Sequence, residues 1–253
     1  MIFRNEQKPR IGVPYRTRKE ELRGDFGKLE PYVDSLRRER AEAVVISLGL
    51  SSAHLEKIAG SLDGLLLPGS PADVNPSHFG AVRHARCVDP DPDRERTDFA
   101  LLEHCLAEQK PVFAICFGLQ SLNVFRSGTL IQDIPSELVT AIEHDGDEEP
   151  GAPDRTHAVE IEPRSRLAQM ADGQHAWVNS SHHQSIREPG RNLRVVSCAS
   201  DGIIEAVEWD SHTNWVMGVQ WHPERMAEAD VMARRLFSEL VAVAGMRKMP
   251  ARA

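Results

Sequence analysis

The 253-residue sequence has neither a long apolar run nor a surplus of basic residues. No stretch approaches the roughly 18 uninterrupted apolar residues that a membrane-spanning helix needs. The formal net charge is −8, whereas a general nucleic-acid-binding surface needs a basic surplus. The N-terminal segment is charged and lacks the apolar core of a signal peptide. We therefore expect a cytoplasmic protein that has neither a membrane nor a nucleic acid as a partner.

Cysteine is also scarce, and none of the cysteines belongs to a recognisable cluster. No Cys-x-x-Cys pair occurs, and no cysteine–histidine group has the spacing of a zinc site. A chain of this length without a signal peptide does not need disulfides. We expect free thiols, no metal site and no cofactor. The four cysteines are Cys87, Cys105, Cys116 and Cys198.

The remaining composition is that of an ordinary globular chain, with 41% hydrophobic and 27% charged residues. The length fits one compact α/β domain, or at most two small ones, and the sequence contains no internal repeat. We expect this domain at residues 10–245, with flexible ends at residues 1–9 and 246–253.

Short apolar runs alternate with amphipathic segments in the first half of the chain. The apolar runs predict strands at residues 10–14, 43–46, 64–67 and 111–115. The amphipathic segments predict helices at residues 26–39, 52–59, 94–108 and 117–125. This alternation predicts a parallel, doubly wound sheet flanked by helices. The run at 43–46 is apolar throughout, which is typical of a central strand.

The second half has short β-like runs without intervening helices, which predict antiparallel hairpins added to the sheet. These runs lie at residues 157–161, 176–179, 193–198, 203–208 and 216–221. An acidic, turn-rich segment at residues 143–154 predicts a solvated loop. Residues 227–244 predict a closing helix with Val231 and Leu236 on its inward face.

Cys116 lies where an apolar strand turns into a helix, in the segment Ala114-Ile115-Cys116-Phe117-Gly118. This is the pattern of a nucleophile elbow, with a small residue two positions before the nucleophile and a glycine two positions after it. The sharp turn presses its flanking positions against neighbouring backbone, so larger side chains would clash there. The helix N-terminus favours a thiolate. A small apolar residue that ends a strand is the alternative, and the elbow pattern alone leaves both open.

Four segments, in the expected order, resemble class I glutamine amidotransferase-like proteins. The closest branch is the gamma-glutamyl-gamma-aminobutyrate hydrolase family. The segments lie at residues 63–76, 115–133, 178–184 and 218–224. The resemblance implies a flavodoxin-like α/β fold and cleavage of γ-glutamyl amide bonds through a thioester. It assigns the nucleophile to Cys116, the base to His222 and the orienting carboxylate to Glu224.

These three residue types suit amide cleavage. An imidazole can take the proton of a thiol and later give it to the departing amine. A carboxylate on the other ring nitrogen fixes the tautomer. Pro223, between His222 and Glu224, marks the end of a strand. His182 and His183 are also candidates for the base by residue type, but the resemblance places their segment in the substrate pocket.

Backbone N–H groups usually stabilise the oxyanion of an acyl-transfer intermediate. The candidates are the N–H groups of Gly69, Ser70 and Phe117, although Pro68-Gly69 could instead be a plain turn. The resemblance implies substrate contacts in the pocket segment, and one more lies a turn beyond the elbow. These candidates are Gln120, Ser180, Ser181 and His182.

The sequence departs from the family pattern beside the nucleophile. Ser70 and Pro71 stand where a second glycine is usual, and Phe117 stands where arginine is frequent. Ser181 replaces a larger residue. The Cys-His-Glu set is untouched, so these changes bear on substrate preference rather than on hydrolysis.

The leading hypothesis is a hydrolase that acts on a small compound resembling γ-glutamyl-γ-aminobutyrate. One alternative is a glutamine amidotransferase subunit that supplies ammonia to a separate synthetase. Another is a non-catalytic binding protein on the same fold. The expected partner is a small γ-glutamyl substrate, and the resemblance also suggests a homodimer.

Overall fold

We describe a computed structural model of the chain at residues 8–146, 154–211 and 213–247. Most of the expected flexible ends and residues 147–153 of the expected acidic loop lie outside these ranges. Within them, no helix is long and apolar enough to cross a membrane.

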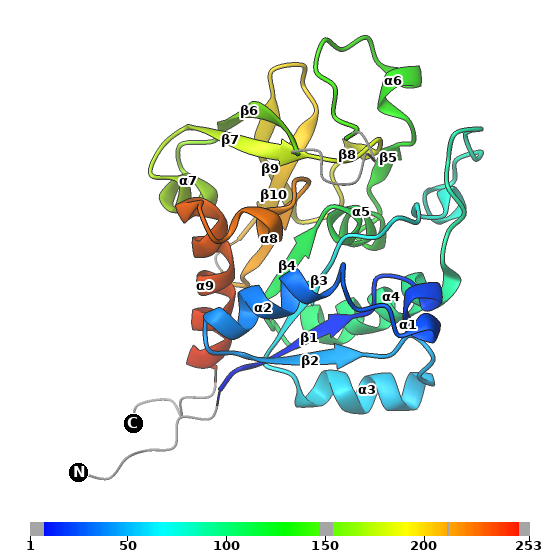
Figure 1. Ribbon diagram of the computed structural model, residues 1–253, viewed down its shortest axis with the longest axis vertical. Coiled ribbons are helices and arrows are strands. Elements are labelled where there is room, and N and C mark those ends of the chain that lie inside the picture. Colours follow the sequence, from blue (N-terminus) through cyan, green and yellow to red (C-terminus); the bar gives the residue numbers. More distant parts are fainter. Residues whose placement is uncertain (1–7, 147–153, 212, 248–253) are drawn as a thin grey trace.

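The described residues form one eleven-stranded mixed sheet with the order β2-β1-β3-β4-β11-β10-β9-β6-β7. The first five strands in this order are parallel: β2 (Glu42–Ile46), β1 (Arg10–Pro14), β3 (Gly64–Leu67), β4 (Val112–Ile115) and β11 (Val216–Val219). The rest are antiparallel: β10 (Ile204–Trp209), β9 (Leu193–Ala199), β6 (Arg155–Ile161) and β7 (His175–Ser180). Beside them, β8 (Ser185–Glu188) joins β10 to β5 (Thr129–Ile131). Figure 1 shows the antiparallel strands gathered above the parallel ones.

The helices cover both faces of the parallel strands, and side chains of β4 alternate between two cores. Phe113 and Ile115 join a cluster that includes α2 (Glu30–Arg38), α7 (Arg166–Ala171) and α9 (Val231–Met246). Val112 and Ala114 join a cluster that includes α3 (Ser52–Ser61), α4 (Pro92–Ala107) and α5 (Phe117–Phe125). The short helices are α1 (Arg18–Arg23), α6 (Ile134–Glu137), α8 (Pro223–Met226) and the 3-10 turn η1 (Pro76–Phe79). The predicted α/β fold, a parallel sheet with added antiparallel strands, is confirmed.

The prediction that residues 43–46 form a central strand is wrong, because β2 lies at the edge of the sheet and pairs with β1 alone. Its run is apolar because helices cover both of its faces. Ala43 and Val45 pack against one core, and Val44 and Ile46 belong to the other. The apolar run therefore indicates that both faces of the strand are covered, and it does not indicate that a strand lies on each side of it.

Two predictions in the second half also need correction. β11 pairs antiparallel with β10 but parallel with β4, so it is not simply part of a hairpin. Val231 is 50% exposed and does not face inward. It follows the cap residue Asp230, whose carboxylate accepts from the Ala233 N–H at 2.6 Å, and the buried face of α9 begins at Met232.

Candidate active site

Three neighbouring parallel strands end at the same edge of the sheet, and each delivers one candidate residue. Gly69 follows β3, Cys116 follows β4 and His222 follows β11. The registers Leu67 with Ala114 and Val219 with Ile115 align the three strand ends. The carboxyl edge of a parallel sheet is the usual place for a ligand site.

Cys116 occupies a strained turn between β4 and α5. Its φ of 51° and ψ of −109° lie in a region that non-glycine residues rarely adopt. A Cβ at Gly118 would lie 2.3 Å from the Leu67 carbonyl oxygen, so only glycine lets α5 start this close to β3. Gly118, two positions after the nucleophile, therefore has the steric role that the sequence predicts.

His222 and Glu224 are joined at the start of α8. His222 Nδ1 lies 2.8 Å from Glu224 Oε1, and both side chains are buried. Asn179 on β7 fixes the backbone of His222, because its Oδ1 accepts from the His222 N–H at 2.8 Å and its Nδ2 donates to the His222 carbonyl at 3.0 Å. Pro223 begins the helix, so Glu224 lies in a helical turn and not on a continued strand.

Burial alone would lower the pKa of His222, but Glu224 and the side chain of Cys116 raise it to about 9. Burial would likewise raise the pKa of Glu224, yet the facing His222 holds it below its ordinary value. The pair is therefore an imidazolium and a carboxylate at neutral pH. A Cβ placed on Gly69 would lie 2.9 Å from His222 Cε1 and 3.6 Å from the Cβ of Cys116, so the imidazole and the thiol face the same small space.

The loop after β3 presents a different set of donors from the one expected. The Gly69 N–H donates to Tyr32 Oη at 3.1 Å, so in this structure it is engaged by α2. No hydrogen bond within the described residues engages the N–H groups of Ser70 or Phe117. A Cβ at Gly69 would lie 2.9 Å from His222 Cε1, so this glycine allows the loop to approach the imidazole.

Arg94 binds the loop after β3. The sequence pattern does not identify this residue as part of the site. Its side chain is fully buried, and Nη2 donates to the Pro68 carbonyl at 2.7 Å. Nε donates to Asp98 Oδ1 at 2.7 Å, and the guanidinium lies 4.8 Å from the centre of the Phe117 ring. Arg94 thus connects the loop after β3 to the first residue of α5.

A cleft of about 370 Å³ opens beside Cys116 and His222. Four other candidates line it: Ser70, Gln120, Ser181 and His182. So do charged groups of both signs: Arg16, Arg86, Arg225, Asp73, Asp133 and Asp145. Ser180 is not among the lining residues, because its side chain is buried and its hydroxyl donates to the His144 carbonyl at 2.8 Å.

The pocket histidines are already engaged elsewhere. His183 Nε2 lies 3.0 Å from Asp73 Oδ1 and Nδ1 lies 3.4 Å from Asp133 Oδ1. The hydrogen bond to Asp73 raises the pKa of His183 to about 8 in spite of burial. His182 Nδ1 faces the Gln184 carbonyl at 3.0 Å. Gln120 Nε2 also donates to the Gln184 carbonyl, at 3.3 Å.

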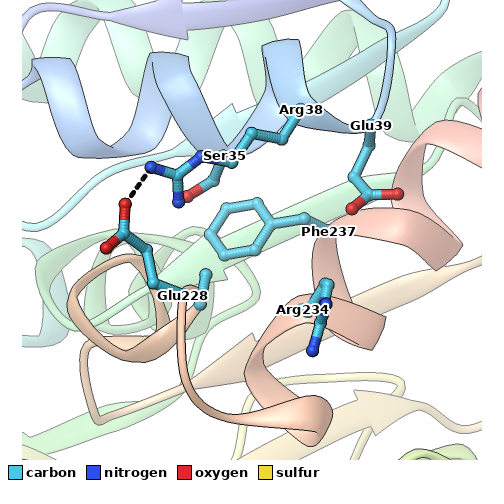
Figure 2. Close-up of a pocket in the computed structure, with 7 residues that line it drawn as sticks. Ser35, Arg38, Glu39, Glu228, Arg234 and Phe237 are labelled. Atoms are coloured by element: carbon cyan, nitrogen blue, oxygen red, sulfur yellow. Dashed lines mark hydrogen bonds and ion pairs between the residues drawn. The ribbon is translucent and has the colours of Figure 1, made fainter.

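Another cavity, of about 470 Å³, lies between α2 and α9. Figure 2 shows Arg38 paired with Glu228 across it, with the Phe237 ring beside this pair. The hydroxyl of Ser35 donates to the Pro31 carbonyl at 2.8 Å. The lining contains no thiol, and its one hydroxyl is engaged, so the cleft at Cys116 is the better candidate.

Comparison with known proteins gives concordant results. Residues 11–224 match the family described as Peptidase C26. The gamma-glutamyl-gamma-aminobutyrate hydrolase PuuD of Escherichia coli is 35% identical over 193 residues, which cover 74% of each chain. Protein NtpR of Enterococcus hirae is 32% identical over 209 residues, covering 80% of this chain and 84% of that protein.

Among solved structures, a Thermoplasma acidophilum protein described as a GMP synthase subunit superposes with a TM-score of 0.65. The match covers 95% of this chain and 96% of that chain at 12% identity. At this identity the likeness shows a shared fold.

Proposed function

The chain belongs to the Peptidase C26 family, and we propose on this premise that it is a hydrolase that cleaves γ-glutamyl amide bonds with Cys116 as its nucleophile. The observation that carries the proposal is the chain of contacts at the sheet edge. Cys116 sits on a strained elbow and lines the same cleft as His222, whose Nδ1 lies 2.8 Å from Glu224 Oε1. This arrangement has the geometry of a nucleophile, a base and an orienting group.

In the proposed reaction, the proton of the Cys116 thiol resides on His222, and the sulfur attacks the γ-carbonyl carbon of the substrate as a thiolate. The N–H groups of Phe117 and Ser70 are the available donors for the resulting oxyanion. The His222 imidazolium then protonates the departing amine as the C–N bond breaks, which leaves a thioester on Cys116. Water attacks the thioester, His222 takes its proton, and the C–S bond breaks, which releases glutamate and restores the Cys116 thiolate beside the His222 imidazolium.

The charges in the cleft support a γ-glutamyl group as the acyl part of the substrate. This group carries an α-carboxylate and an α-ammonium. The cleft supplies three guanidinium groups and three carboxylates, which can pair with such a zwitterion. For the amine part of the substrate we rely on the named activity of the relatives, and we propose γ-glutamyl-γ-aminobutyrate or a similar compound.

The test is a hydrolysis screen over γ-glutamyl amines, glutamine and γ-glutamyl peptides, comparing wild type with Cys116→Ala. We expect turnover of at least one γ-glutamyl amine by the isolated chain, and a loss of at least about 10³-fold in Cys116→Ala. Cys198→Ala is the matched control, because Cys198 is a half-buried free thiol on β9.

Equal activity in wild type and Cys116→Ala would overturn the mechanism. Activity that requires an added synthetase would favour an ammonia-supplying role. A binding protein would form no covalent adduct at Cys116 with a glutamine-analogue electrophile.

A further inference from the structure

A buried cluster of three histidines and one glutamate lies behind the cleft wall, and the proposed reaction does not use it. His157 comes from β6, Glu205 from β10, His182 from the segment after β7, and His144 from the connection before β6. At most 6% of any of these residues is exposed. Four separate segments of the chain thus deliver their side chains to one point.

The distances within this cluster fit a metal ion better than direct hydrogen bonds. One nitrogen of each imidazole faces Glu205 Oε1, at 3.4 Å from His144, 3.3 Å from His157 and 3.6 Å from His182. All the inward atoms lie within 4.8 Å of one another. In a tetrahedral zinc site with bonds of about 2.0–2.1 Å, neighbouring ligand atoms are about 3.3 Å apart.

The inward atoms also lack hydrogen bonds. Within the described residues, none of the three inward nitrogens has a hydrogen bond, and neither does either carboxylate oxygen of Glu205. Buried polar atoms are normally satisfied, so a group of five unpaired atoms in one place needs an explanation.

The outward ring nitrogens explain why these atoms remain unpaired. Each one faces an oxygen acceptor, so each outward nitrogen carries the hydrogen, and in a neutral imidazole the inward nitrogen then presents a lone pair. The acceptors are Asp201 Oδ2 for His144 at 2.9 Å, the Ala158 carbonyl for His157 at 3.3 Å and the Gln184 carbonyl for His182 at 3.0 Å. Three lone pairs aimed at a carboxylate repel one another unless a cation lies between them. Outer partners of this kind are typical of histidines that bind metals.

We propose that His144, His157, His182 and Glu205 bind one divalent transition-metal ion, and that zinc is the ion this ligand set favours. Imidazole nitrogens with one carboxylate suit zinc, and four protein ligands without an open position make a structural site. The charges also balance, because the ion offsets the carboxylates of Glu205 and Asp201.

The proposed metal site fixes the segment that forms one wall of the cleft. His182 is a ligand, while its neighbours Ser181 and His183 line the cleft. The metal would tie this segment to β6 and β10, so its removal loosens the pocket without touching Cys116. The sequence spacing predicts no metal site, because no two of the four ligands lie within one strand or loop.

Metal content tests the site independently of hydrolysis. Wild-type protein is stripped with a chelator, dialysed against zinc chloride and then zinc-free buffer, and analysed by inductively coupled plasma mass spectrometry. We expect one zinc ion per chain, and an anomalous-scattering peak at the zinc edge among the four side chains in crystals of wild type. Substoichiometric zinc with no such peak would overturn the proposal in favour of a protonated histidine network.

A chelator competition assay compares the zinc affinity of three variants with that of wild type. Asp201→Asn removes only the outer partner of His144 and should weaken zinc binding by about 10–100-fold. Glu205→Gln removes a ligand and should weaken it further. His183→Asn changes the adjacent histidine outside the cluster and should keep one zinc ion per chain. Equal zinc affinity in Glu205→Gln and wild type would contradict the proposed ligand set.

Discussion

His222 is held in its charged form by its neighbours, and this has a consequence for the reaction. Burial opposes the charge, but Glu224 and Cys116 raise the pKa of His222 from 6.5 to about 9. The imidazolium is the acid that protonates the departing amine in the proposed reaction. We therefore expect kcat/KM to fall above pH about 9, as His222 loses its proton. A pH–rate profile with a γ-glutamyl amine measures this limb.

The raised pKa of His222 also predicts how the stability of the folded chain depends on pH. A raised folded-state pKa means that protonation of His222 stabilises the folded chain below pH 6.5, and that this term is lost as the pH rises through about 9. Glu224→Gln removes the main attraction, so the alkaline limb should move toward pH 6.5 and the rate should fall by about 10²–10⁴-fold. Glu228→Gln, which changes an exposed glutamate paired with Arg38, should leave the limb in place. An unmoved limb in Glu224→Gln would rule out this account.

At this scale, the sequence predicts the residues that carry the proposed reaction but not those that hold them. Cys116, His222 and Glu224 stand in short motifs with recognisable spacing. Tyr32 falls on the apolar face of a helix, so its pattern predicts a core residue and not a partner for Gly69. Arg94 is charged and near the start of a helix, where exposure is usual, yet it is fully buried. These contacts join distant segments, and local patterns do not contain them.

The junction of β4 and α5 depends on one missing side chain. A Cβ at Gly118 would lie 2.3 Å from the Leu67 carbonyl oxygen, which is backbone and cannot rotate away. Gly118→Ala should therefore lower the free energy of unfolding by about 1–3 kcal/mol, as overpacking does. It should also lower kcat, because α5 and Cys116 must shift together. Urea denaturation and steady-state kinetics on the same variant measure both effects.

Gly173→Ala is the matched control for this substitution. A Cβ there would meet nothing within 4 Å, and the residue has no positive φ. The free energy of unfolding should stay the same or rise by about 0.4–1 kcal/mol. If Gly118→Ala were as stable and active as Gly173→Ala, the steric reason for the glycine in the elbow would be wrong.

The sequence predicts the bounds of several elements, but it does not predict which strands are neighbours. α5 spans the residues predicted for it, and β1 and β3 do as well. The apolar pattern of a strand indicates which of its faces are covered, but not which strands lie beside it. The pattern therefore does not predict that β2 lies at the edge of the sheet, or that β11 pairs parallel with β4 and antiparallel with β10. β8 and α6 have four residues each, like β3, but they lack the uninterrupted apolar run that marks β3 in the sequence.

At the scale of the whole molecule, one apolar core spans both halves of the sheet. Ile11 and Phe113 of the parallel half share a cluster with Val159 and Val196 of the antiparallel half. Helix α9 packs in the same cluster through Phe237. Because neither half can separate without exposing this surface, the two halves should form one cooperative unit.

Native-state hydrogen exchange tests this cooperativity. We expect amides in the middle of β4 and of β9 to exchange with the same opening free energy, and to depend equally on denaturant, because both require global unfolding. Amides of α1, a six-residue helix with no buried residue, should exchange through local opening at a much lower free energy. The measurement uses the full chain as purified. If β9 opened at a lower free energy than β4, with a smaller denaturant dependence, the antiparallel strands would be a separate unit. The shared core would then be too weak to couple the cleft wall to the strand that carries Cys116.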